Sequence, residues 1–482
     1  MKRTGIVWGV LALLLLQVIG LPSGAAAAGN PQNVKVVTFN NPDGVAGDGD
    51  MFGYSVALSG DASTVLIGAF AANESGINAV GKAYIFTSIN GTWSVNPAAT
   101  FIDPELQPLD KFGNYVALSA DGSTALIGGG NQIAYVYEKV NGAWSGTPSA
   151  VLNDPDPTDG GFFGDCFGCA LALSADGNMA LIGAFGAGIN GVSGVGKVYV
   201  FTRNNGTWTP TPVATLSDPG TVKGDGFGYS VALSADGDVA LIGTNHMFAA
   251  GRAFIFSQNN GSWGVTPIAT FGISEPGAFN FDGSSVALSA EGNVALIGVG
   301  GLNNGTGIAY IYAAPNNIWP DLPTATLNNP NTTAGSHFGG AVTLSSDGST
   351  AVIQATYSVN VYVQSGGQWP SLPSTSLSNP NGPNDALGIS SLAVSSNGDS
   401  VLVGASSPGN CVLPPPNPVP CNPPGPGQAF LFQTSNRWAN PTPAPPPSNP
   451  GGSSGGGAFG WLSVVALFTL LMLTKTLTRP NR

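Results

Sequence analysis

Charged side chains are scarce in this chain. They make up 8% of its 482 residues, whereas ordinary soluble domains carry roughly a quarter. Low charge together with 70 glycines could indicate disorder, but 43% hydrophobic residues is too much apolar surface for that class. The composition therefore favours an all-β fold of many short strands joined by glycine-rich turns.

Basic residues are scarcer still, with 14 Lys and Arg against 26 Asp and Glu. Five of the basic residues lie in the two terminal segments: Lys2, Arg3, Lys475, Arg479 and Arg482. The body between those segments therefore has nine basic and 26 acidic residues, a net charge of −17. Such a surface repels phosphate backbones, so we expect no nucleic-acid partner. Solubility is a sufficient reason for the acidity.

Histidine occurs only twice, as His246 and His337. The two lie in different repeats, and neither is accompanied by a Gly-x-Ser-x-Gly elbow. We therefore expect loop histidines rather than a His-dependent triad or a His/Cys metal site. The sequence predicts no catalytic residue and no enzyme.

Cysteine occurs four times, as Cys166, Cys169, Cys411 and Cys421. The two ends of the chain indicate export, which favours disulfides, although four cysteines allow three pairings. We favour Cys411–Cys421, which would close a proline-rich insertion, and Cys166–Cys169. A redox-active Cys-x-x-Cys opens a helix in a βαβ unit, and no such unit is predicted.

Both ends carry address signals. Residues 1–28 have a basic start, an apolar centre and a small-residue exit, which predicts a secretory signal peptide. Residues 441–457 form a Pro/Gly/Ser-rich linker, and residues 458–482 combine a short apolar segment with a basic end. Basic residues after the apolar segment would stay in the cytoplasm. We therefore expect an exported protein at the cell surface or in the envelope, anchored in the membrane by this segment, processed there, or secreted.

The tail resembles the GlyGly-CTERM sorting signal, in which a Gly-rich motif, an apolar helix and a basic end follow one another. Here these parts are residues 451–457, residues 458–473 and the basic residues Lys475, Arg479 and Arg482. The resemblance implies processing by a rhomboid-like protease during delivery to the surface.

The region between the ends is a sevenfold repeat. One copy contains residues 227–237, 239–243, 251–256, 260–263 and 268–271. The first turn of each copy is marked by an acid or its amide: Asp61, Asp121, Asp176, Asp236, Glu291, Asp347 and Asn397. Each copy closes with a tryptophan: Trp93, Trp144, Trp208, Trp263, Trp319, Trp369 and Trp438. Seven marks of each kind indicate seven copies of one supersecondary unit.

Each copy predicts four strands. The first alternates larger and smaller side chains, and the second is apolar at every position, as in a strand buried on both faces. Asn-Gly follows the third strand in four copies and is a strong hairpin signal, because both turn residues need φ > 0. The fourth strand starts at the tryptophan and is interrupted by proline, which cannot donate to a ladder, so this strand lies at an edge.

Four-stranded units repeated seven times predict a seven-bladed β-propeller, which we place at residues 31–440. Trp438 is followed by proline-rich sequence, and the missing fourth strand matches residues 34–39 at the front of the chain. We therefore expect the N-terminal strand to complete the last blade and leave no open edge. A linear solenoid is the alternative, and it would not need a shared blade.

The copies resemble the FG-GAP repeats of integrin α-subunit propellers and their bacterial relatives. Phe-Gly begins at Phe52, Phe112, Phe167, Phe227 and Phe338, and Gly-Ala at Gly68, Gly183 and Gly404. The resemblance spans about residues 34–438 and implies the same propeller. The seventh copy has Leu387-Gly388 instead, and the first hairpins read Ser-Ala-Asp-Gly, so the resemblance does not extend to the acidic loops of calcium-binding members.

Asp154, Asp156 and Asp159 are the residues best placed for a cation. Alternate acidic oxygens before Gly160 can converge on Ca²⁺, although the downstream Glu of a full calcium loop is missing. The alternative is a solvated acidic loop, in which no carboxyl pKa should be raised. No other cofactor is predicted. The acids at the first hairpins are expected to bond the backbone N–H groups of their own turns.

In antiparallel units the 2→3 and 4→1 connections emerge on one face of the disc, and the 1→2 and 3→4 connections on the other. The first set varies in length and content, whereas the second is short and nearly invariant. Variable loops on a rigid scaffold commonly carry binding sites, so we expect a binding or adhesion module for a protein or carbohydrate ligand. These loops hold acids but almost no His, Lys or Arg. The alternatives are a propeller hydrolase or lyase with loop carboxylates, and an envelope protein without a specific ligand.

Overall fold

A computed structural model gives the fold of the chain between its terminal segments. It describes residues 33–44, 49–130, 132–157, 164–220, 223–245, 251–272, 285–381, 391–406, 427–436 and 438. The predicted signal peptide 1–28, the linker 441–457, the segment 458–482 and the Cys411–Cys421 pair lie outside these residues. No helix within the described ranges is long and apolar enough to span a membrane.

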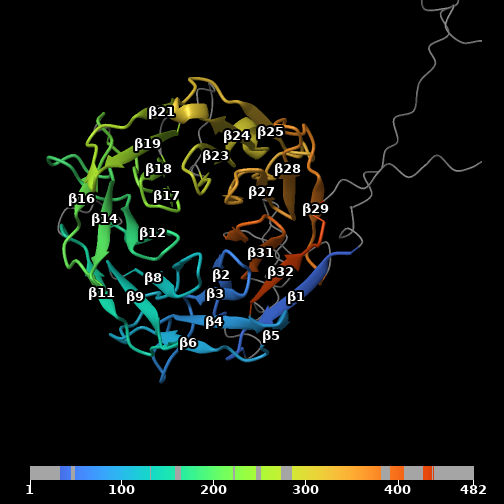
Figure 1. Cartoon of the computed structure of the whole chain (residues 1–482). Helices are drawn as coiled ribbons and strands as arrows, with labels where there is room; N and C mark the ends of the chain where they lie inside the picture. Colours follow the sequence, from blue (N-terminus) through green and yellow to red (C-terminus); the bar gives the residue numbers. More distant parts are fainter. Residues whose placement is uncertain are drawn as a thin grey trace, which may run out of the picture. The chain divides into compact units, whose positions relative to one another are not determined.

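The described residues form seven antiparallel sheets, which Figure 1 shows as blades around a common centre. The predicted all-β, seven-bladed propeller is confirmed. Because each blade lies between two others, its second strand is covered on both faces. In β3 (Thr64–Ala69), for example, every residue is buried.

Blades 1 to 4 share one strand pattern, in which the outermost strand is split in two. Blade 1 runs outward through β2 (Phe52–Leu58), β3, β4 (Lys82–Ile89), β5 (Thr92–Trp93) and β6 (Ala99–Ile102). Blade 2 has β7 (Tyr115–Leu118), β8 (Thr124–Gly128), β9 (Ile133–Val140), β10 (Ala143–Trp144) and β11 (Ala150–Asn153). Blade 3 has β12 (Phe167–Leu173), β13 (Met179–Ala184), β14 (Lys197–Asn204), β15 (Thr207–Trp208) and β16 (Ala214–Leu216). Blade 4 has β17 (Ser230–Leu233), β18 (Val239–Gly243), β19 (Arg252–Asn259), β20 (Ser262–Trp263) and β21 (Ala269–Gly272).

Blades 5 to 7 have four strands each. Blade 5 has β22 (Ser285–Leu288), β23 (Val294–Val299), β24 (Ile308–Ala313) and β25 (Ala325–Asn328), with the short helices α1 (Leu302–Gly305) and η1 (Pro315–Asn317). Blade 6 has β26 (Val342–Leu344), β27 (Thr350–Ala355), β28 (Ser358–Val363) and β29 (Thr375–Leu377). Blade 7 has β30 (Leu392–Val394), β31 (Ser400–Ala405), β32 (Gln428–Gln433) and β1 (Lys35–Asn40).

The local signals act as the sequence predicts. Asn90 and Gly91 at the 3→4 hairpin of blade 1 have φ of 50° and 74°, the left-handed conformation that Asn-Gly adopts most readily. In the same blade β5 and β6 both pair with β4, and the residues between them, which include Pro97, leave the ladder. The interrupted fourth strand is therefore the outer edge, where a missing N–H donor costs least.

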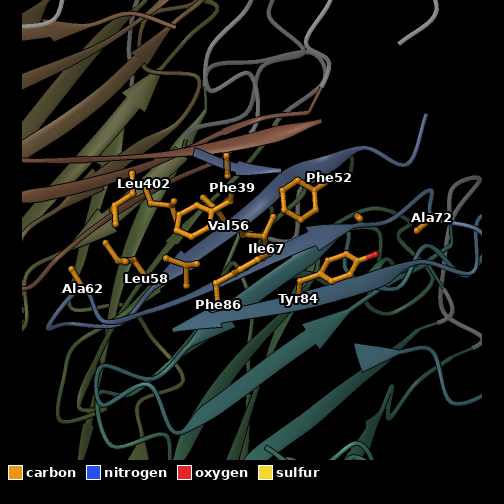
Figure 2. Packing of buried hydrophobic residues seen from close by; sticks show 14 residues of the cluster. Phe39, Phe52, Val56, Leu58, Ala62, Ile67, Ala72, Tyr84, Phe86 and Leu402 are labelled. Atoms are coloured by element: carbon orange, nitrogen blue, oxygen red, sulfur yellow. The ribbon is translucent and has the colours of Figure 1, made fainter. Parts of the chain in front are cut away.

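The ring closes through the N-terminal strand. β1 pairs antiparallel with β32 from Lys35 opposite Gln433 to Asn40 opposite Gln428, and Figure 1 shows the two side by side. Phe39 of β1 also packs on the next blade, with its ring centroid 5.1 Å from those of both Phe86 and Trp93. Figure 2 shows Phe39 in one apolar cluster with residues of blades 1 and 7. The shared blade is confirmed, and the linear solenoid is excluded.

A ring of backbone hydrogen bonds joins all seven blades at their 1→2 turns. Each bond runs from a backbone N–H to the equivalent carbonyl in the next blade, at 2.8 to 3.1 Å. The members, in order, are Gly60, Ala120, Ala175, Ala235, Ala290, Ser346 and Ser396, whose N–H returns to Gly60. Since every member both donates and accepts, no blade can be displaced without breaking two of these bonds.

The recurring acid at these turns is structural. Ser59 Oγ accepts hydrogen bonds from the N–H groups of Ser63 and Thr64 and donates to Asp61 Oδ1 at 2.7 Å. The serine-to-acid or serine-to-amide bond recurs in blades 2, 3, 4, 6 and 7, and in blade 5 Ser289 bonds Asn293 instead. Asp61 Oδ1 also accepts the N–H of Ser63 at 2.9 Å, so the carboxylate satisfies the backbone of its own turn, as the sequence predicts.

The Phe-Gly and Gly-Ala dipeptides form the seams between blades. A Cβ added to the glycine of Gly-Ala would overlap the carbonyl oxygen of the Phe-Gly glycine in the next blade. The same holds for the equivalent glycine in copies that lack Gly-Ala. These pairs are Gly68 with Gly113, Gly128 with Gly168, Gly183 with Gly228, Gly298 with Gly339, and Gly404 with Gly53. The Phe-Gly members have φ between 84° and 94°, which only glycine adopts readily.

Candidate functional site

The loop face of the propeller, which consists of the 2→3 and 4→1 connections, carries a repeated polar pair. One partner follows the fourth strand and precedes a proline, and the other stands two residues before Phe-Gly. In the pair that leads into blade 1, Asn41 Nδ2 donates to Asp50 Oδ2 at 2.7 Å. In the pair that leads into blade 6, Asn329 Nδ2 donates to Ser336 Oγ at 2.6 Å. An amide thus supplies the hydrogen to each of these buried pairs.

In the pair that leads into blade 4, both partners are carboxylates. Asp218 and Asp225 are 1% and 0% exposed, and Arg252 Nη2 bridges them at 2.6 and 2.8 Å. One guanidinium cannot neutralise two buried carboxylates. Burial first, and the neighbouring Asp218 next, raise the pKa of Asp225 to about 7, against the opposing effect of Arg252.

Replacing Asp225 by asparagine should change how stability depends on pH. The folded-state pKa of about 7 lies above the ordinary value of 3.8. The stabilisation by the bound proton is therefore complete below about pH 4 and lost as the pH rises through 7, an effect on the order of 4 kcal/mol. The variant's amide can donate to Asp218 at any pH, so Asp225→Asn should unfold at a higher temperature than the wild type at pH 8, with the difference shrinking towards pH 5.

Thermal unfolding of the full-length protein from pH 5 to 8 measures this difference. Asp321→Asn, at an exposed position, is the control and should follow the wild type throughout. An Asp225→Asn variant that stays parallel to the wild type over the whole range would show that Asp225 is ionised in the folded protein at pH 5.

Of the candidate calcium residues, Asp154 belongs to the pair that leads into blade 3, and Asp156 follows it. Asp154 is only 8% exposed, its Oδ1 accepts the N–H of Asp156 at 2.9 Å, and burial raises its pKa above the ordinary value. The interpretation as a fully solvated loop without a raised pKa is therefore wrong for Asp154, because its carboxyl is buried beside that of Asp165. Asp156 remains half exposed and pairs with Lys197 at 3.1 Å.

Asp159 lies outside the described residues, so calcium at this loop stays a prediction. Within the described ranges, no group of three or more His, Cys, Asp or Glu side chains is arranged to hold a metal ion. His246 also lies outside them. His337 begins the backbone turn around Phe338-Gly339, where its carbonyl accepts the N–H of Gly340 at 2.9 Å.

Basic side chains on the loop face were missed from the sequence. Lys82, Lys197 and Arg252 each stand at the first position of a third strand, where the 2→3 connection ends. Lys82 Nζ bonds Asp43 at 2.6 Å and Glu74 at 2.8 Å. The expectation of almost no Lys or Arg on this face is therefore wrong. A comparison of the repeats with one another could have predicted these residues, because all three occupy the same strand position.

A disulfide joins Cys166 and Cys169 across the Phe167-Gly168 turn, with a Cα–Cα distance of 5.4 Å. The backbone turn beneath it, from Cys169 N–H to Cys166 carbonyl at 3.1 Å, recurs without cysteines before β7 and β17, between Asn114 and Lys111 and between Tyr229 and Gly226. The predicted bridge is confirmed. It reinforces a turn that the other blades form unaided, in a β structure and not at the start of a helix.

Comparison with protein families matches residues 39–86 to the FG-GAP repeat. The match covers the end of β1, the strands β2 and β3 and the first part of β4, and so includes Phe52-Gly53 and Gly68-Ala69. No curated protein matches the chain. The described body is therefore a seven-bladed β-propeller in which residues 39–86 match the FG-GAP repeat.

Proposed function

We propose that this FG-GAP propeller is an exported binding or adhesion module that recognises a protein or carbohydrate through its loop face. The observation that carries the proposal is the asymmetry between the two faces. Among the 2→3 connections that the structure describes, lengths range from the tight turn at residues 356–357 to the long loop at residues 70–81, whereas the 1→2 turns all share one hydrogen-bonded form. Connections that vary most on one face of a closed scaffold are the arrangement of a recognition surface.

Exposed apolar side chains on the loop face add support. Leu106 and Leu109 in the connection before blade 2 are 40% and 66% exposed, and both have positive φ. A strained backbone that holds leucines towards solvent costs stability, so a contact with a partner is a reason to keep it.

Binding is a better account of this face than hydrolysis. Asp225 has the pKa that a general acid needs, but its side chain is 0% exposed and bonded to Arg252. A substrate cannot reach it in this arrangement. We therefore propose no catalytic residue.

The address signals in the sequence support a binding face outside the cell. Residues 1–28 carry the export pattern, and residues 458–482 carry the short apolar segment with its basic end. A tether at the C-terminal side of the propeller would hold the module at the surface.

One experiment tests face and address together. Cells that produce the full chain are probed with fluorescent arrays of glycans and secreted proteins, beside cells that produce Leu106→Asp/Leu109→Asp or the control Val140→Asp. Val140 is 61% exposed in the hairpin that joins β9 and β10, on the opposite face. The double variant should bind at least tenfold less and the control should bind normally. Truncation after Pro450 should move the binding activity into the medium.

Equal loss in the control and the double variant would refute the assignment to the loop face. A truncated chain that stays with the cells would refute the anchor, and cells of the full chain that bind no array member would refute the binding proposal.

A further inference from the structure

The connection that leads into blade 4 is held to the long 2→3 loop of blade 3, residues 185–196, which we call the blade 3 finger. Backbone hydrogen bonds run from the connection to the finger. They join Gly224 to Ser193 at 3.3 Å, Gly226 to Gly194 at 3.0 Å and Phe227 to Val195 at 2.9 Å. The ring of Tyr229 also meets Phe185 of the finger, with centroids 5.4 Å apart. The two segments therefore form one unit of the loop face.

The same connection carries the buried carboxylates Asp218 and Asp225, which lie side by side because both bond the single Nη2 atom of Arg252. In the equivalent pairs that lead into blades 1 and 6, an asparagine supplies a hydrogen to its partner. Two ionised carboxylates have no hydrogen to share. Oδ1 of Asp225 is buried and has no hydrogen-bond partner within the described part of the chain, which costs free energy. A proton on Asp225 supplies the hydrogen that the pair lacks.

Asp225 is the member of the pair that can leave. Gly224 and Gly226 on either side of it have φ of 73° and 64°, and glycine changes its backbone conformation at little steric cost. Asp218 is fixed more firmly, because its Oδ1 also accepts the N–H of Gly220 at 2.8 Å. When Asp225 ionises, one guanidinium faces two buried anions, which it cannot neutralise. The least costly relief is for Asp225 to move into water.

We propose that ionisation of Asp225 releases residues 223–227 from the blade 3 finger, so that a single proton controls the shape of the loop face between blades 3 and 4. The charged groups that face Asp225 are Asp218 and Arg252. Residues 185–196 of the finger contain no titratable side chain, and Lys223 of the connection is exposed. His246 lies outside the described residues and is tested below. The proposal does not depend on which ligand the loop face binds.

The direction of the pKa shift gives the pH range of the release. Burial first, and Asp218 next, raise the pKa of Asp225 to about 7 in the closed contact, against the opposing effect of Arg252. In the released connection the carboxyl returns towards its ordinary pKa of 3.8. The proton therefore stabilises the closed contact fully below about pH 4, and this stabilisation is lost as the pH rises through 7.

Hydrogen exchange of the full-length protein at pH 5 and pH 8, read by mass spectrometry and corrected for the intrinsic rate at each pH, tests this inference. Protection of the Gly224, Gly226 and Phe227 amides should fall on the order of tenfold or more between the two pH values. Exchange in β18 should stay slow at both, which shows that the opening is local. Asp225→Asn can donate its amide hydrogen at any pH and should keep the protection. Asp321→Asn, at an exposed position, is the control and should follow the wild type.

Equal protection of these amides at pH 5 and pH 8 in the wild type would overturn the proposal. A fall in protection that Asp225→Asn retains would overturn it as well, because another group would then control the contact. If His246→Gln abolishes that retained fall, the group is His246. Similar melting temperatures at pH 5 will show that the variants fold.

Discussion

Replacing Gly68 by alanine should destabilise the propeller by on the order of 3 kcal/mol, because nothing at the seam can move aside. A Cβ at Gly68 would overlap the carbonyl oxygen of Gly113 in the next blade. The obstacle is backbone, held by its own hydrogen bonds, so the two blades would have to separate locally. Denaturant unfolding of the full-length protein measures the loss.

Gly146→Ala is the matched control. Gly146 is exposed in the outer edge of blade 2, and an added Cβ there meets nothing within 4 Å. Alanine should even stabilise the protein there, by up to about 1 kcal/mol, because it narrows the unfolded ensemble. If the two substitutions shift stability in the same direction and by similar amounts, glycine at the seam is not needed for close approach.

Deleting residues 34–39 should cost on the order of 5 kcal/mol and make the protein self-associate, since it removes a buried aromatic and a strand ladder together. Phe39 is 3% exposed and supports Phe86 and Trp93 of blade 1. Without β1 the backbone edge of β32 is open to pairing with another chain. Calorimetry should show a lower melting temperature, and light scattering should show oligomers.

A peptide of residues 34–40 should restore both the melting temperature and the monomer when added to the deleted protein. A scrambled peptide of the same composition should do neither. A deleted protein that melts like the parent and stays monomeric would refute the closure by β1.

The propeller could be predicted from sequence because its signals are local and occur seven times. Asp-Gly and Asn-Gly turns, apolar second strands and closing tryptophans each specify one part of a blade. Because the pattern occurs seven times, a single copy that departs from it does not change the prediction. Closure of the ring could be predicted as well. The sequence after Trp438 lacks a fourth strand, and residues 34–39 match the missing one. The packing role of the seam glycines could not be predicted from the sequence, since Gly68 and Gly113 lie in different copies and meet only where two blades pack together.

The polar pairs of the loop face were harder to find. Asp218 and Asp225 belong to one loop, but Arg252 contacts them from the start of β19. No local sequence pattern predicts this contact. Asp154 was selected for its spacing to Asp156, whereas its burial goes with a contact to Asp165, eleven residues further along the chain.

The shared blade also decides how the molecule would respond to mechanical tension. In blades 1 to 6 the last strand is an outer edge, and a pull on it would peel its ladder open one pair at a time. β32 instead lies between β31 and β1, with ladders on both sides along its whole length. A pull on the chain beyond β32 therefore loads two ladders in shear, so that many hydrogen bonds must break at once. Beyond the end of β32, Trp438 Nε1 donates a hydrogen bond to the Gly398 carbonyl at 2.7 Å, which holds the chain in place after that strand. A propeller closed in this way resists being unravelled from its C-terminal end.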